Sequence, residues 1–231
     1  MTTIKEQQEL FTILGRSLKK KLECYLIGGS AMLDYGAKDV TKDIDIVFID
    51  EKSREMAVEA LKALGFKERE TRLLYVDKKN TPVLLQRADD RFDLFNEKII
   101  DFRFTESMAE RVHSIYEYNN LIAKIVSPED IILLKCATER AGDRIDAAKL
   151  IRQFNIKWDT IIEESALQMK LIGDVIPLEL YNFFSELKED LGIDIPKRVM
   201  EKLRLMSEKA LEEKLKKGHI KVTKYKGGHH S

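Results

Sequence analysis

One short region constrains the fold of this chain more than any other. Residues 26–30 read Leu-Ile-Gly-Gly-Ser, and after twelve intervening residues the chain reads Asp-Ile-Asp at 43–45. The apolar residues before the glycine pair predict a buried strand that turns there into a short helix at about 31–35. Alternation from about 43 to 49 predicts a second strand. Because side chains on a strand alternate between its faces, Asp43 and Asp45 lie on one face.

This pattern has a chemical interpretation. Two carboxylates ~7 Å apart on one strand face can share a hard divalent cation, and they repel each other without one. Gly28 and Gly29 permit close backbone approach, and Ser30 offers a hydroxyl and N–H groups to phosphate oxygens at a helix start. A phosphate cradle beside metal-binding carboxylates is what nucleotidyl transfer requires. The alternative interpretation of the same residues is a tight turn followed by a solvated strand edge.

The remaining pattern divides the chain into two parts. Up to about residue 126 it predicts helices and strands, and from Ser127 it predicts helices alone, starting with Ser127-Pro128-Glu129-Asp130. The further helices are expected at about 4–21 and 53–64 and then at about 127–141, 143–154, 158–170, 177–191 and 195–216. The further strands are expected at about 73–76, 82–86, 92–95, 113–118 and 120–126.

We therefore predict an α+β fold with three segments. A mixed sheet with flanking helices is expected over about residues 1–126, an all-helical domain over about 127–218, and a flexible tail over about 219–231. The hydrophobic content of 44% excludes a disordered chain.

Charge and cysteine content exclude further classes. Lys+Arg and Asp+Glu each number 40, so a general nucleic-acid coat is excluded, although a local basic patch could still bind RNA. No apolar run approaches the ~18 residues of a membrane span, so no membrane partner is expected. The two cysteines form no Cys-x-x-Cys pair, which indicates reduced thiols and a cytoplasmic protein.

Residues 26–30, taken with Thr41-Lys42-Asp43-Ile44-Asp45-Ile46-Val47, resemble a known signature. It is that of the polymerase-beta-type nucleotidyltransferase superfamily, in which a hydrophobic-Gly-Gly/Ser start is followed by Asp-x-Asp. The resemblance implies a short mixed sheet, two Mg²⁺ ions, a nucleoside triphosphate (NTP) co-substrate such as ATP, and a third carboxylate on a neighbouring strand. Asp93, an acid within an apolar segment, is the best candidate for that carboxylate, although a solvated surface acid would look the same. Asp93 would complete the second metal site or take a proton.

A narrower resemblance involves the segment 127–135 and the acids that follow it. Pro-Glu-Asp-Ile, then Lys135, Asp143 and Asp146, is similar to the Pro-Glu-Asp-Leu … Lys … Asp-x-x-Asp region of the abortive-infection-type toxin nucleotidyltransferases. The resemblance implies that Lys135 contacts nucleotide phosphates and that Asp143 or Asp146 completes the site. Lys135 shares a helix face with Ile131 and therefore borders the apolar side. The helices after about residue 158 match no family.

These observations leave more than one function open. We expect a magnesium-dependent nucleotidyltransferase that moves a nucleoside monophosphate from an NTP to the hydroxyl of an RNA, a protein side chain or a small molecule. The alternative is a catalytically inactive nucleotide-binding module or an antitoxin-like interaction partner. A third hypothesis gives the function to the helical half, and a large exposed apolar patch there would support it. The acceptor, the preferred base and the oligomeric state stay open.

Overall fold

A mixed sheet forms the first half of the protein. The computed structural model describes residues 1–70, 79–138 and 140–217. Within that part the main sheet has seven strands in the order β10-β11-β2-β4-β7-β6-β5. The β11–β2 and β4–β7 pairs are parallel and the other neighbours are antiparallel. In sheet order the strands are Ser114–Tyr118, Leu121–Ile125, Leu22–Leu26, Ile44–Val47, Asp90–Phe95, Val83–Arg87 and Lys67–Arg69.

Two short strand pairs lie outside the main sheet. β1 (Thr2–Thr3) pairs with β3 (Val40–Thr41), and β8 (Lys98–Ile99) pairs with β9 (Phe102–Arg103). The β1–β3 pair ties the N-terminus to the segment that precedes β4.

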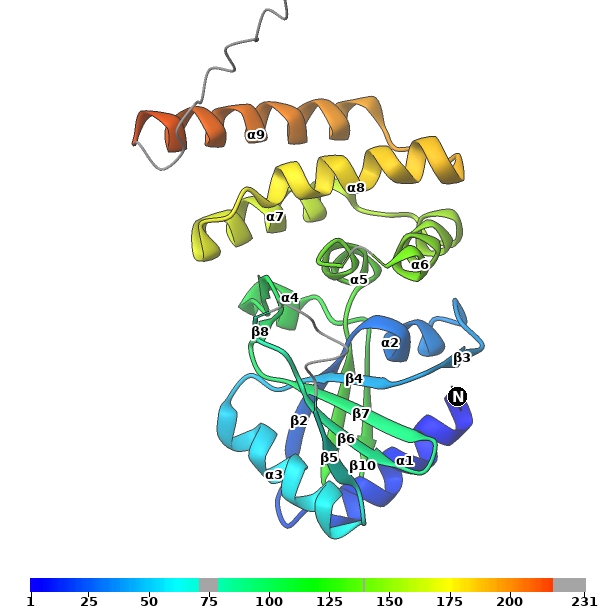
Figure 1. Ribbon diagram of the computed structural model, residues 1–231. Coiled ribbons are helices and arrows are strands. Elements are labelled where there is room, and N and C mark those ends of the chain that lie inside the picture. Colours follow the sequence, from blue (N-terminus) through cyan, green and yellow to red (C-terminus); the bar gives the residue numbers. More distant parts are fainter. Residues whose placement is uncertain (71–78, 139, 218–231) are drawn as a thin grey trace, which may run out of the picture.

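Four helices accompany the sheet. They are α1 (Ile4–Ser17), α2 (Gly28–Asp34), α3 (Glu51–Ala63) and α4 (Glu106–Glu110). A capping box between Thr3 and Glu6 starts α1, which then buries Phe11 and Leu14. In Figure 1, α1 and α3 lie at the end of the sheet away from the later helices, and α2 lies between the sheet and those helices.

The second half is a stack of helices. It contains α5 (Pro128–Lys135), α6 (Ala141–Gln153), α7 (Trp158–Ile172), α8 (Ile176–Leu191) and α9 (Lys197–Lys216). Figure 1 shows α5 and α6 next to the sheet region, α7 and α8 above them, and α9 outermost. Apolar side chains join neighbouring helices; for example, the ring of Trp158 in α7 packs edge-on against Phe184 in α8, with 5.6 Å between the ring centroids. No described helix is long and apolar enough to cross a membrane.

The predicted fold class is confirmed, since a mixed sheet with flanking helices precedes an all-helical region. The expected strand at 73–76 and the tail at 219–231 lie outside the described residues. Three boundaries were wrong. The helix expected over 4–21 ends at Ser17, the helix expected at 31–35 begins at Gly28, and the helix expected over 127–141 ends at Lys135. The first stops where lysines replace the apolar residues of the periodic pattern.

Candidate active site

Three carboxylates meet on neighbouring strands. β4 and β7 run parallel, and Asp45 lies directly opposite Asp93 in their register. Asp43 comes two residues before Asp45, immediately before β4 begins at Ile44. One carboxylate oxygen from each of the three lies within 4.8 Å of the others, a grouping found by searching the described residues. We call these residues the acidic triad.

The negative charges of the three carboxylates in the acidic triad repel one another. Burial raises the pKa of Asp45 well above its ordinary value, and the neighbouring charges of Asp43 and Asp93 raise it further. Asp93 is fully buried, whereas the side chain of Asp43 keeps 22% of its exposure. A divalent cation with a preference for oxygen ligands would relieve this repulsion, so the donor set fits Mg²⁺.

Arg91 already offsets part of this negative charge. It lies two residues before Asp93 on β7, and its guanidinium donates from Nε to Oδ1 of Asp93 at 2.8 Å and from Nη2 to Oδ2 at 2.5 Å. Nη2 also lies 3.4 Å from Oδ2 of Asp43. Arg91 was not among the expected site residues. Strand alternation would have placed it on the face of Asp93.

The glycine pair lies against these acids. Gly28 has a φ of +56°, and a Cβ atom there would lie 2.7 Å from Oδ2 of Asp45. A Cβ atom on Gly29 would lie 2.4 Å from the hydroxyl oxygen of Thr41. A side chain at either position would therefore crowd the site, and at Gly28 it would also strain the backbone.

Ser30 is placed differently from its expected role. Its hydroxyl is buried, donates to the Asp43 carbonyl at 3.2 Å and accepts from the Asp45 N–H at 2.9 Å. The hydroxyl therefore fixes α2 against the segment that carries two of the acids. The expectation that this hydroxyl contacts phosphate needs correction, because its hydrogen bonds go to the backbone.

A cationic group lies across from the acidic triad. Lys135, at the end of α5, lies 2.5 Å from Oδ1 of Asp143 and 2.8 Å from Oδ2 of Asp146. Lys38 also donates to Oδ2 of Asp146, at 2.8 Å. Burial alone would lower the pKa of Lys135, but the two aspartates outweigh it and raise that pKa. The lysine therefore stays charged although it is buried.

Asp143 and Asp146 thus hold lysines in place. Burial would raise the pKa of Asp146, but Lys135 and Lys38 outweigh it and lower that pKa. We expected one of these aspartates to complete the site. The structure brings both to the cavity that Asp43 and Asp45 line, but their carboxylates engage the lysines. Lys38 was missed, although a basic residue between the Gly-Gly-Ser and Asp-Ile-Asp segments was a usable signal.

A cavity of about 430 Å³ joins these groups, a size suited to a small ligand. Asp43, Asp45 and the glycine pair contribute to its lining, and Lys38, Lys135 and Arg140 bring positive charge to it. Thr41 and Lys42 of the signature segment also line the cavity, as do Phe95, Ile99, Ile100 and Thr138, which were not expected there. The arrangement combines a metal-binding geometry with lysines that are held by aspartates of the same cavity.

Comparison with known sequences agrees with this arrangement. A family described as "Nucleotidyl transferase of unknown function (DUF2204)" matches residues 6–173, which is more than half of the chain and includes the acidic triad and Lys135. The chain belongs to this family. The nucleotidyl transferase match ends before α8, so α8 and α9 lie beyond it.

Two further comparisons concern solved structures and curated protein sequences. The structure resembles the crystal structure of an antigenic nucleotidyltransferase-like protein from Paracoccidioides brasiliensis, with a TM-score of 0.43 and 15% sequence identity, covering 87% of this chain and 94% of that one. No curated protein sequence gives a significant match.

Proposed function

We propose that this protein is a magnesium-dependent nucleotidyltransferase that moves a nucleoside monophosphate from an NTP to an acceptor hydroxyl. The observation that carries the proposal is the acidic triad, two of whose members, Asp43 and Asp45, line a cavity that lysines also line. Metal-binding carboxylates beside a phosphate-binding surface are the parts that this reaction needs. Membership of a nucleotidyl transferase family supports the same reaction class.

Each residue has a role in this proposal. Asp43 and Asp45 would hold Mg²⁺, and Asp93 would complete a second ion's site or accept the acceptor's proton. Bound Mg²⁺ would neutralise charge on the phosphates and activate the attacking oxygen. The acceptor oxygen bonds to the α-phosphorus, the bond from that phosphorus to the β-phosphate oxygen breaks, and pyrophosphate leaves.

The triphosphate would lie between α2 and the lysines. Lys135 and Lys38 both line the cavity, and we assign them to the phosphates. Gly28 and Gly29 would allow the backbone to approach the nucleotide, with Ser30 holding this turn in place. The acids Asp143 and Asp146 would contribute to nucleotide binding by fixing the lysines.

A second candidate is a catalytically inactive nucleotide-binding or antitoxin-like module. The contact that favours it is Arg91, whose guanidinium pairs with Asp93 and Asp43 and so competes with a metal ion for them. Three parts of the proposal rest on sequence alone: the toxin-like role suggested by the segment 127–135, a cytoplasmic location, and an acceptor that is an RNA, a protein or a small molecule. The division into units at 1–126 and 127–218 also rests on sequence alone.

Calorimetry with ATP, CTP, GTP and UTP tests the proposal, each with and without Mg²⁺. We expect magnesium-dependent binding of at least one nucleotide by the wild type and its loss in Asp43→Ala/Asp45→Ala. Asp39→Ala is the matched control, because Asp39 is an exposed aspartate of the same segment that does not line the cavity. Nucleotide binding that changes neither on removal of Mg²⁺ nor in the double variant would overturn the proposal. Nucleotide binding with no release of pyrophosphate in the presence of any acceptor tested would favour the inactive module.

A further inference from the structure

The active-site cavity has an apolar side that the reaction as proposed does not use. Four apolar side chains of its lining form this side, which we call the apolar wall: Phe95, Ile99, Ile100 and Leu134. Phe95 lies two residues beyond Asp93 on β7, which is about 7 Å along the same strand face. Leu134 comes directly before Lys135 on α5. The apolar wall therefore lies beside both the acidic triad and a lysine that we assign to the phosphates.

Ile100 has an unfavourable backbone conformation. β8 and β9 are joined by a turn of two residues, Ile100 and Asp101, since Ile99 pairs with Phe102. Ile100 has a φ of +54°, which lies in the left-handed region that β-branched residues avoid. Glycine or asparagine is the usual residue at such a position. A residue of the wrong type persists there only where the surrounding structure enforces the conformation.

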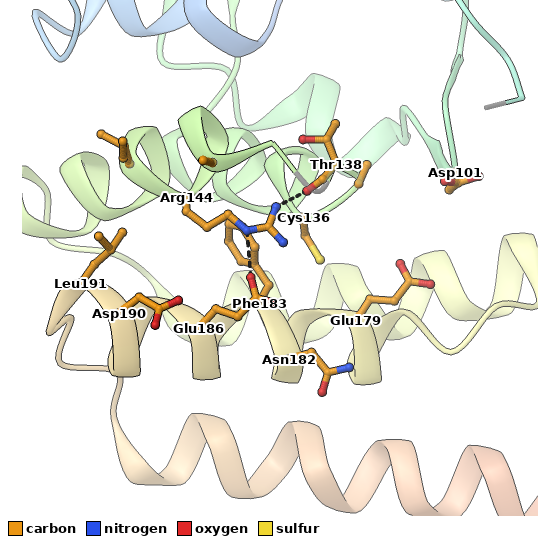
Figure 2. A pocket seen from close by; sticks show the side chains of 13 residues that line it. Asp101, Cys136, Thr138, Arg144, Glu179, Asn182, Phe183, Glu186, Asp190 and Leu191 are labelled. Atoms are coloured by element: carbon orange, nitrogen blue, oxygen red, sulfur yellow. Dashed lines mark hydrogen bonds and ion pairs between the residues drawn. The ribbon is translucent and has the colours of Figure 1, made fainter. Parts of the chain in front are cut away.

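Asn80 holds this turn in place. Its Nδ2 donates to the Ile100 carbonyl at 2.8 Å, and its own carbonyl accepts from the Ile100 N–H at 3.3 Å. Both backbone groups of Ile100 are therefore engaged, and its largely buried side chain lines the active-site cavity. Asp101, the other turn residue, lines a second cavity, between α5–α6 and α8 (Figure 2). The turn thus places an isoleucine, and not its acidic neighbour, at the active site.

The polar side chains of the lining offer little to the hydrogen-bonding edge of a base. Asn and Gln, which read base edges through a paired donor and acceptor, are absent from the described lining residues. Thr138 donates its hydroxyl to Asp143, and Thr41 lies against the glycine pair. Lys42 and Arg140 are exposed. An apolar surface, in contrast, can hold any base, because every base presents a flat face.

We propose that the apolar wall, and Ile100 in particular, binds the face of the nucleobase and makes the site tolerant of the base that the NTP carries. This inference rests on the proposed nucleotidyl transfer. Apolar contacts separate related ligands by about 100-fold at most, whereas sites built on hydrogen bonds separate them by about 10⁴-fold or more. We therefore expect ATP, GTP, CTP and UTP to bind with affinities within about 100-fold of one another.

Calorimetry on the full chain with Mg²⁺ tests the inference, with the four NTPs and inorganic tripolyphosphate as ligands. Tripolyphosphate has no base or sugar, so it reports on the metal and lysine contacts alone. In Ile100→Asn, which suits the left-handed turn but replaces the apolar side chain, we expect ATP to bind about tenfold more weakly and tripolyphosphate to bind as before. Ile100→Gly, which also suits the turn, should act in the same way. Ala88→Asn is the matched control, because Ala88 has a φ of +50° in an exposed turn outside the lining.

The outcomes separate this inference from the proposed function. One NTP that binds far more than 100-fold more tightly than the other three would show a base edge read by hydrogen bonds and would overturn the inference. Equal ATP affinity in the wild type and both Ile100 variants overturns it too. So does weaker tripolyphosphate binding in these variants, because Ile100 would then support the phosphate site. Each of these results leaves nucleotidyl transfer standing. Absence of magnesium-dependent binding of every NTP by the wild type contradicts the proposed function itself.

Discussion

Asp45 lies among charges of its own sign. The fold brings it into register with Asp93, it lies two residues along the chain from Asp43, and partial burial limits its contact with solvent. Arg91 compensates Asp93 and Asp43, which it contacts directly. The local structure is therefore organised around an excess of negative charge that a bound cation would remove.

This excess predicts how stability depends on pH. The pKa of Asp45 is raised in the folded state, mainly by burial, so the stabilising proton is fully bound below the ordinary value of 3.8 and lost as pH rises through the raised pKa. Without metal, the melting temperature of the wild type should therefore fall relative to that of Asp45→Asn as the pH rises above 3.8. Thermal denaturation in EDTA and in Mg²⁺ measures this. Parallel profiles for the two proteins in EDTA would contradict it.

Arg91 provides a second test at the residue scale. Arg91→Gln removes a positive charge that lies 2.5 Å from one carboxylate of the triad and 3.4 Å from another. A divalent ion would then meet less repulsion, and we expect Mn²⁺ to bind about tenfold more tightly, equal to about 1.4 kcal/mol. Electron paramagnetic resonance of free Mn²⁺ gives the affinity. Arg204→Gln, on α9, is the control. Unchanged or weaker binding in Arg91→Gln would show that Arg91 does not compete with the metal.

The site divides into residues that local sequence could predict and residues that it could not. Strand alternation places Asp43 and Asp45 on one face because that periodicity is local. The approach of Asp93 depends on the register between β4 and β7, which no local pattern specifies. The same holds for the Lys38–Asp146 contact, which joins residues far apart in the chain.

At the scale of elements, one ionic cluster joins the two halves. Arg111, just after α4, pairs with Asp130 of α5 and Glu164 of α7. These carboxylates keep only 1% and 2% of their side-chain exposure. Thr105 adds a hydrogen bond to Glu164 at 2.8 Å. Next to the cluster, Gln168 pairs with the backbone of β9. Both acids depend on Arg111 for an opposite charge, and the position of α5 and α7 depends on this cluster.

Replacement of Arg111 should therefore lower the stability of the folded protein. Arg111→Leu leaves two buried carboxylates without their cation, and we expect the free energy of unfolding to fall by about 3–5 kcal/mol. Arg204→Leu, which removes an exposed pair with Glu208, should cost about 0.5 kcal/mol. Urea denaturation of both variants provides the comparison. A difference below about 1 kcal/mol between them would contradict the assigned importance of the cluster.

Element boundaries show where sequence patterns stop being informative. Glycine occupies the first position of α2, at Gly28, although it has a low helix propensity. It does so because the close approach of Asp45 leaves no room for a side chain. The strands β8 and β9 are two residues each and too short to show periodicity. The long helices α7, α8 and α9 were predicted within a few residues because each carries a sustained apolar stripe.

At the scale of the whole molecule, the contacts between halves predict cooperative unfolding. Trp158, the single tryptophan, lies in α7 and packs on Phe184, so its fluorescence reports the helical half. We expect the fluorescence transition in urea to coincide with the loss of circular dichroism. A fluorescence transition at lower urea, followed by a second one seen by circular dichroism, would show that the halves unfold independently.

The central claim is that the acidic triad and the lysines across the cavity bind a metal–nucleotide complex. Crystals grown with Mn²⁺ and α,β-methylene ATP test it most directly, because anomalous scattering locates manganese without assumptions about the ligand. We predict an anomalous peak in contact with Asp43 and Asp45, with triphosphate oxygens bound to it and to Lys135. Nucleotide bound elsewhere, or in this cavity with no manganese at the triad, would contradict the claim.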